Sequence, residues 1–180
     1  MDQEPRIPSV PDEELGPTEV VQAIRKRRGG TLLNLDRMLL NSPAFAVGWN
    51  TFLGAVRNAL TLDPKLRELA ICAVAVINRA EYEWLQHAPE FLAAGGTQEQ
   101  LESLRDVEAA SWDMTRFNAI ERAVLELSLE MSREVQVSDA CFERIRQRLG
   151  STQQLVELVG VIASYNMVSR FLEALQVQPE

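Results

Sequence analysis

The chain has 180 residues, of which 46% are hydrophobic and 24% charged, which is ordinary for a globular protein with a sizeable core. Its formal net charge of −8 repels nucleic acid, so we expect no nucleic-acid partner. Its two cysteines, Cys72 and Cys141, are far apart in the sequence and predict no disulfide framework.

Residues 1–17 are predicted to form an extended N-terminal arm, because they contain four prolines and several acids but no core of their own. The arm is either a mobile tail or a segment that wraps a neighbouring subunit. This polar start does not resemble a signal peptide, so we expect a cytoplasmic protein with no membrane partner. Residues 18–180 are predicted to form a single helical domain.

Helix-capping residues are spread along this domain and predict where its helices begin. They are Thr18, Ser42, Asp63, Thr97, Ser138 and Ser151. Gly29–Gly30 and Gly95–Gly96 are typical helix ends, whereas residues 107–115 are predicted to be a loop. No stretch predicts a dependable strand, so the expected fold is all-α.

The segment from Glu68 to His87 organises the rest of the chain. It contains nine consecutive apolar residues, 69–77, which are too few to span a bilayer and indicate an element buried on all sides. One continuous helix over residues 64–94 would be about 45 Å long, as wide as the whole domain. A break is therefore predicted at Asn78, since asparagine tolerates a helix end.

A hairpin that turns at Asn78 would place Glu68 opposite His87, the only histidine of the chain. Glu83 precedes His87 by four residues and would lie on the same helix face. One imidazole between two carboxylates can hold and move a proton, so these three residues are candidate catalytic groups. The alternative is a surface Glu–His pair without a function.

Four further residues are candidates for substrate binding: Trp49, Tyr82, Asn166 and Arg170. Trp49 lies on a predicted helix that starts at Pro43, where it either packs in the core or lines a pocket. Asn166 and Arg170 are four residues apart on the final helix. We favour a structural hydrogen-bond network for this pair, and the functional alternative is a clamp for a substrate carboxylate.

The sequence of this segment resembles the carboxymuconolactone decarboxylase and alkylhydroperoxidase D-like family. Glu68 and His87 match the glutamate and histidine of that family's motif, and the resemblance extends over most of residues 35–175. Peroxidase members also carry a Cys-x-x-Cys pair, for which this chain has Ala80 and Glu83. The resemblance implies the alkylhydroperoxidase D-like fold of about eight helices, assembled as a trimer or hexamer.

Three functional hypotheses follow. The first is a cofactor-independent proton-transfer enzyme, of decarboxylase or lyase type, acting on a small carboxylic acid or lactone. The second is a non-catalytic oligomeric module in which Glu83 and His87 form a buried network. A peroxidase is less favoured, because peroxide reduction in the family needs a reactive thiolate and a resolving partner. One histidine and two distant cysteines also predict no metal site, and we expect no cofactor.

We also expect a homo-oligomer whose active site lies near a subunit boundary. A helix that is apolar all round, as residues 69–77 predict, must be covered on every side. The final helix is the best candidate for the subunit contact, because Tyr165, Met167, Arg170 and Phe171 are of types that interfaces favour.

Overall fold

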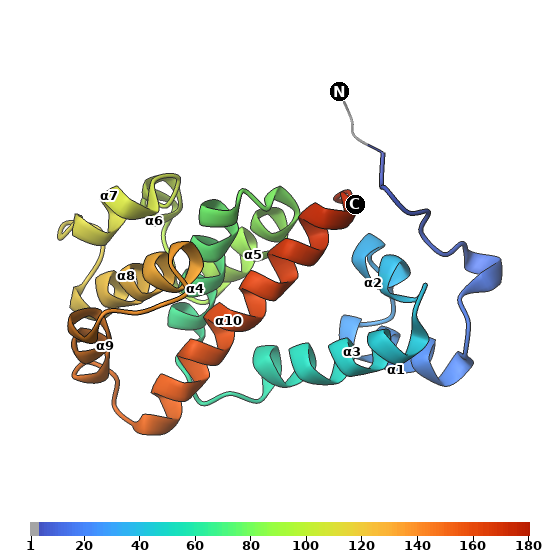
Figure 1. The fold of residues 1–180 in the computed structure, drawn as a ribbon, viewed down its shortest axis with the longest axis horizontal. Helices are drawn as coiled ribbons and strands as arrows, with labels where there is room; N and C mark the ends of the chain where they lie inside the picture. The colour runs from blue at the N-terminus through green and yellow to red at the C-terminus, as the bar shows by residue number, and fades with distance from the viewer. Residues whose placement is uncertain (1–3) are drawn as a thin grey trace. The chain divides into compact units, whose positions relative to one another are not determined.

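The computed structural model describes residues 4–180, so the first three residues of the predicted arm lie outside the described part. The fold is all-α, as predicted, and no strand occurs among residues 4–180. Within them lie ten α-helices, rather than about eight, and one 3₁₀ helix at Asp12–Glu14 in the arm (Figure 1).

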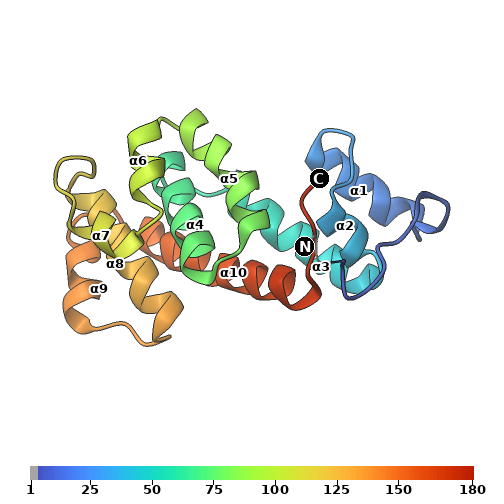
Figure 2. The same cartoon turned by 90° about the horizontal axis from the view of Figure 1, so that it is seen from above.

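The chain divides into two compact units. The first comprises the chain up to Ala59 together with Phe171–Glu180. It contains α1 (Thr18–Arg28), α2 (Asn34–Leu39) and α3 (Pro43–Asn58), and both shorter helices pack against α3 (Figure 2). The prediction that residues 18–180 form one domain stays a prediction.

The second unit, Leu60–Arg170, carries the candidate site. Its helices are α4 (Pro64–Asn78), α5 (Glu81–Ala93), α6 (Gln98–Ser103), α7 (Val107–Trp112), α8 (Ala119–Arg133), α9 (Asp139–Arg146) and α10 (Thr152–Leu175), the last continuing into the first unit. The central helix α4 packs against both α5 and α8. Its residues 69–75 are at most 1% exposed, as the apolar run predicts.

Most of the predicted helix starts are confirmed. Asp63 accepts a hydrogen bond from the Lys65 amide at 2.7 Å, and Thr97 forms the expected capping box. The prediction for Thr18 is wrong, because Pro17 takes the N-cap position and Thr18 is the first helical residue. The Ser42 side chain makes no capping hydrogen bond, although α3 does start directly after it.

The predicted loop at residues 107–115 is also wrong over its first six residues, where the structure has α7. The Asp106 carboxylate caps this helix by accepting from the Ala109 amide at 3.0 Å. Val107 and Ala110 are buried, so tertiary packing stabilises a helix that is only six residues long. Short helices of this kind depend on contacts that the local sequence does not reveal.

The long helix α10 has the length and composition of a membrane span, with a mean hydropathy of 1.4 over its most apolar window. More than half of that window, 56%, is buried inside the protein. A buried core helix has the same length and composition, so this feature is weak evidence for a membrane.

Candidate active site

The α4–α5 hairpin turns where the sequence predicts. Helix α4 ends at Asn78, and the next residue, Arg79, has the left-handed conformation with φ 57°. Ala80 then takes the N-cap position of α5. This tight reversal sets the two helices side by side and brings residues nineteen positions apart into contact.

Glu68 of α4 and His87 of α5 meet across this hairpin. The Nδ1 atom of His87 lies 2.7 Å from Oε2 of Glu68 and the two side chains are 5% and 3% exposed, so the predicted pairing of these residues is confirmed. The Arg67 guanidinium donates from Nε to the other Glu68 oxygen at 3.1 Å. Both carboxylate oxygens of Glu68 are therefore bound.

The environment of Glu68 contains opposing influences on its ionisation. Burial raises the pKa of the Glu68 carboxyl, but the hydrogen bonds and charges of His87 and Arg67 together outweigh burial and leave the pKa below its ordinary value. The carboxylate is therefore ionised at neutral pH. An ionised acceptor at Nδ1 favours a proton on that nitrogen and fixes the orientation of the ring.

Glu83, one helical turn before His87, is 1% exposed. The Ser169 hydroxyl of α10 lies 2.9 Å from Glu83 Oε2 and also 2.9 Å from the Tyr165 carbonyl. The Tyr165 ring meets the His87 ring edge-on, with 4.9 Å between centroids. Helices α4, α5 and α10 thus each contribute side chains to one buried cluster.

Sequence reasoning missed Ser169 and Arg67 as members of this cluster. The spacing of Tyr165 and Ser169, four residues apart, indicates that they share a helix face. It does not indicate that this face meets α5. Arg67 is adjacent to Glu68 in sequence, and neighbours on a helix normally point in different directions.

Asn166 and Arg170 form the structural network that we favoured for them. Asn166 accepts at Oδ1 from Asn78 at 3.0 Å and from Arg170 at 2.8 Å. Its amide nitrogen donates to the Ser132 hydroxyl at 2.9 Å. The network joins the ends of α4 and α8 to α10, and a role of this pair in substrate binding stays a prediction.

The two aromatic candidates are both buried. Tyr82 follows the first residue of α5 and is 4% exposed. Trp49 belongs to the first unit, where its ring packs against Phe45 and Phe171 with centroids 5.8 and 5.1 Å apart. Their roles in substrate binding stay predictions.

Cys72 does not replace the missing redox cysteines. Its side chain is fully buried in α4, and burial raises the pKa of the thiol far above its ordinary value, with the Glu68 and Glu83 carboxylates adding to the effect. The thiol is therefore protonated at neutral pH, whereas a peroxidatic cysteine needs a thiolate.

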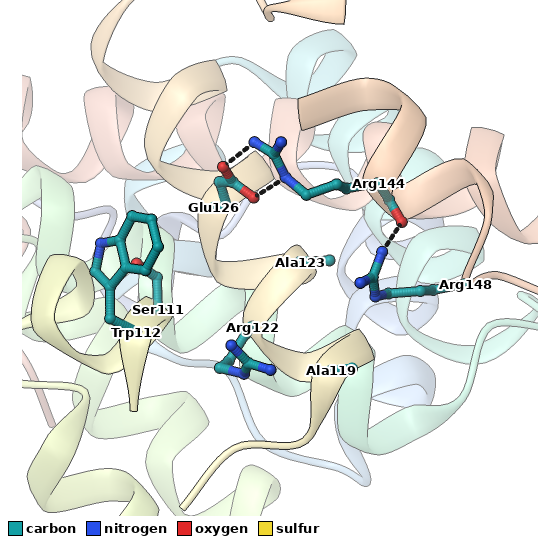
Figure 3. Close-up of a pocket in the computed structure, with 8 residues that line it drawn as sticks. All are labelled: Ser111, Trp112, Ala119, Arg122, Ala123, Glu126, Arg144 and Arg148. Carbon is teal, nitrogen blue, oxygen red and sulfur yellow. Dashed lines mark hydrogen bonds and ion pairs between the residues drawn. The ribbon is translucent and has the colours of Figure 1, made fainter. Parts of the chain in front are cut away.

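One pocket was not predicted from the sequence. It is lined, among others, by Trp112 of α7, Arg122 and Glu126 of α8, Arg144 of α9 and Arg148, which follows α9 (Figure 3). Because these residues come from separate elements, only the tertiary structure brings them together.

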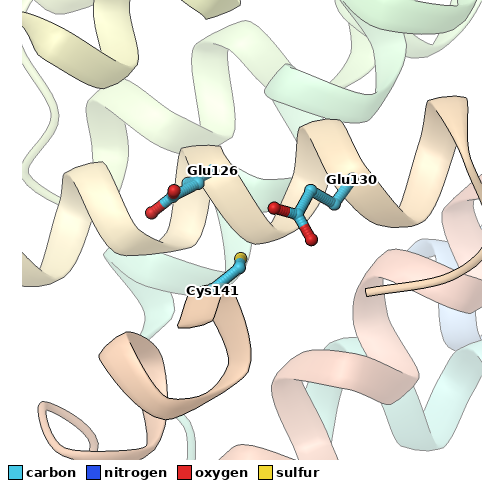
Figure 4. A group of neighbouring side chains, drawn as sticks. All are labelled: Glu126, Glu130 and Cys141. Atoms are coloured by element: carbon cyan, nitrogen blue, oxygen red, sulfur yellow. The ribbon is translucent and has the colours of Figure 1, made fainter. Parts of the chain in front are cut away.

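Next to this pocket, Glu126, Glu130 and Cys141 form a group whose ligand atoms lie within 4.8 Å of one another (Figure 4). As a metal centre the group fits poorly. Arg144 binds both oxygens of Glu126, and Ser138 donates to both oxygens of Glu130. Burial, with the Glu130 and Glu126 charges, raises the pKa of the Cys141 thiol to about 12. A metal ion would have to displace all of these interactions.

Comparison with known proteins finds one family whose model matches the region of the site. Residues 43–126, a range that contains Glu68, Glu83 and His87, match the model of the carboxymuconolactone decarboxylase family. No curated protein matches the chain significantly.

Solved structures with the same fold cover nearly the whole chain. A peroxidase-related protein from Silicibacter sp. TM1040 is 17% identical, with a TM-score of 0.80 over 99% of this chain and 95% of that one. An alkylhydroperoxidase AhpD core protein from Ralstonia eutropha JMP134 is 18% identical, with a TM-score of 0.81 over 98% and 92%.

A cysteine-to-alanine variant of the debrominase Bmp8, in complex with 2,3,4-tribromopyrrole, is 14% identical, with a TM-score of 0.74 over 100% and 94%. At these identities the likeness concerns the fold alone. The match over residues 43–126 and the shared helical fold make the chain similar to the carboxymuconolactone decarboxylase and alkylhydroperoxidase D-like family, and Ala80 and Glu83 stand where the Cys-x-x-Cys pair would be.

Proposed function

We propose that this protein is a cofactor-independent proton-transfer enzyme of the decarboxylase or lyase type. Its substrate is a small carboxylic acid or lactone. His87 is the general acid and base, Glu68 orients it, and Glu83 supplies a second carboxylate beside it.

The observation that carries the proposal is the 2.7 Å contact between His87 Nδ1 and Glu68 Oε2 among buried side chains. An imidazole held by an ionised carboxylate has a fixed orientation, and its positive form is stabilised. General acids and bases need this control, because the proton must be delivered at a defined position.

In the decarboxylase form of the reaction, the bond between the substrate α-carbon and its carboxylate breaks and releases CO₂. The electron pair of that bond stays on the α-carbon as a carbanion or enolate. The protonated His87 gives its proton to this carbon, and water then returns a proton to the imidazole. Glu68 remains ionised and stabilises the imidazolium before the transfer.

A non-catalytic oligomeric module is the second candidate, and one observation favours it. Glu68, Glu83 and His87 are all at most 4% exposed, as in a structural network of the core. In such a network these residues stabilise the α4–α5 hairpin and catalyse no reaction.

The test is a turnover screen with β-keto acids and unsaturated lactone acids, using wild type, His87→Gln and Glu68→Gln. We expect His87→Gln to lose turnover by a factor of about 100 or more, the usual contribution of a general acid–base group. Arg146→Gln, a change in an exposed residue of α9, is the control and should keep full activity. Equal turnover by His87→Gln and wild type on every accepted substrate would rule out the proposal.

We further propose that the protein acts in the cytoplasm as a homo-oligomer, trimer or hexamer, with α10 at the subunit contact. Val156 is 66% exposed and Met167 38% exposed on this helix, and apolar side chains at such positions suit an interface. Arg170→Ala is expected to weaken assembly in analytical ultracentrifugation. A stable and active monomer at micromolar concentration would contradict this proposal.

A further inference from the structure

The pocket between α7, α8 and α9 gathers arginines in a chain whose net charge is −8. It holds about 230 Å³, and its lining includes Arg122, Arg144 and Arg148 against one carboxylate, Glu126. Figure 3 shows Arg144 and Arg148 on one side of the pocket and Trp112 on the other, with α8 between them. This positively charged lining contrasts with the negative net charge of the chain as a whole.

Only one of the three positive charges is neutralised. Arg144 binds both oxygens of Glu126, with Nε donating at 2.8 Å. Arg148 donates instead to the backbone carbonyl of Arg144 at 2.7 Å, a neutral acceptor. Neither Arg148 nor Arg122 forms an ion pair with any other of residues 4–180. The pocket therefore keeps two guanidinium groups without a carboxylate.

Arg122 adds a second, independent indication of a ligand. Its Nε atom is buried and has no hydrogen-bond partner in the described part of the chain. Buried donors are nearly always hydrogen-bonded, because a donor removed from water without an acceptor is costly. A rotation of the Arg122 side chain that turns Nε toward the pocket would let an oxygen of a bound anion provide the acceptor that the protein does not.

The wall opposite the arginines is aromatic and exposed. Trp112 is 77% exposed, although most of the tryptophan side chain is usually buried in folded proteins. Ala119 and Ala123 of α8, which also line the pocket, are small and leave room within it. A flat ring can stack on an indole face in such a space.

From this geometry we propose that the pocket is a binding site for a small aromatic carboxylate. Arg122 and Arg148 bind the carboxylate, which suits the fork of donors on a guanidinium. The aromatic ring of the ligand stacks on Trp112. The volume is below the range of about 300–1,000 Å³ that is usual for drug-sized ligands, so a single ring fits better than a larger molecule. Glu68, Glu83 and His87 are not part of this lining, so the site is separate from the proposed catalytic cluster.

Isothermal titration calorimetry at low salt tests the ligand class, with benzoate as the probe. We expect benzoate to bind with a dissociation constant on the order of 1 mM or lower. Acetate has the charge without the ring, and benzamide has the ring without the charge. Each should bind about tenfold more weakly than benzoate. If either binds as tightly as benzoate, the proposed recognition is wrong.

Substitutions of the lining residues then test whether benzoate binds in this pocket. Arg148→Gln changes an exposed side chain and should weaken benzoate binding about tenfold or more, as should Arg122→Gln and Trp112→Ala. Arg146→Gln removes another α9 arginine, whose partner is Glu143, and should bind as wild type does. Thermal unfolding checks that each variant is folded. Unchanged benzoate affinity in folded Arg148→Gln would overturn the proposal, whatever the outcome of the turnover screen at His87.

Discussion

Replacing Glu68 by glutamine measures what the buried carboxylate contributes to stability. Glutamine keeps the size of the side chain but removes the charge that holds His87 at 2.7 Å and Arg67 at 3.1 Å. A hydrogen bond to a charged group contributes about 1.5–3 kcal/mol to stability. The Arg67 side chain is 16% exposed and can turn to water, so the loss comes mainly from the His87 contact. We therefore expect a loss of about 1.5–3 kcal/mol at pH 7, or roughly 3–12 °C in Tm.

The dependence of stability on pH shows whether the charged form of Glu68 is the one that stabilises the fold. The pKa of Glu68 in the folded protein is below 4.5, the ordinary value for a glutamate side chain. The stabilisation from its charge is thus fully present above about pH 5 and is lost as the pH falls through the folded pKa. The difference between wild type and Glu68→Gln should therefore be large at pH 7 and should shrink toward zero at the acid end.

Urea unfolding followed by circular dichroism at pH 7, 5.5, 4 and 3 measures this difference. Glu143→Gln is the matched control, because Glu143 also accepts from an arginine, Arg146, but does so at the surface. Its effect should be much the smaller of the two, since exposed ion pairs contribute little. A Glu68→Gln protein as stable as wild type at pH 7 would refute the reasoning, as would a penalty that stays constant down to pH 3.

Three further predictions concern packing, hydrogen bonding and reactivity. Gly96→Ala would place a Cβ 2.3 Å from the ring of the fully buried Phe91 and should lower the free energy of unfolding, measured in urea, by about 1–3 kcal/mol. Its control is Gly48→Ala inside α3, where the new Cβ meets nothing within 4 Å and should raise the free energy of unfolding by about 1 kcal/mol. Asn166→Ala removes the centre of its network and should lower the free energy of unfolding by about 1–3 kcal/mol, and a loss below the error of the measurement would show that water replaces the network. Cys72→Ser should leave the low background of peroxide-dependent turnover unchanged, and a thiol reagent should not label Cys72 in the folded protein. If Cys72→Ser abolished peroxide turnover, the conclusion that the buried thiol is protonated would be wrong.

Much of the helical framework could be predicted from local sequence. The cap at Asp63, the capping box at Thr97 and the break after Asn78 are each decided by a few consecutive residues. Steric and hydrogen-bonding preferences act between residues this close in the chain, so these features can be predicted from the local sequence. The break after Asn78, combined with the rise of 1.5 Å per helical residue, was sufficient to predict that Glu68 faces His87.

The contacts that only the tertiary structure decided join residues far apart in the chain. The Ser169 hydroxyl reaches Glu83 across 86 positions, and α7 forms where a loop was expected because its buried residues pack in the core. Arg122, Arg144 and Trp112 line one pocket although they come from three helices. The sequence by itself determined where helices start, stop and turn, together with the Glu68–His87 pair that one turn brings together. Which helix faces meet depends on how all side chains fill the core at once, and no single segment contains that information.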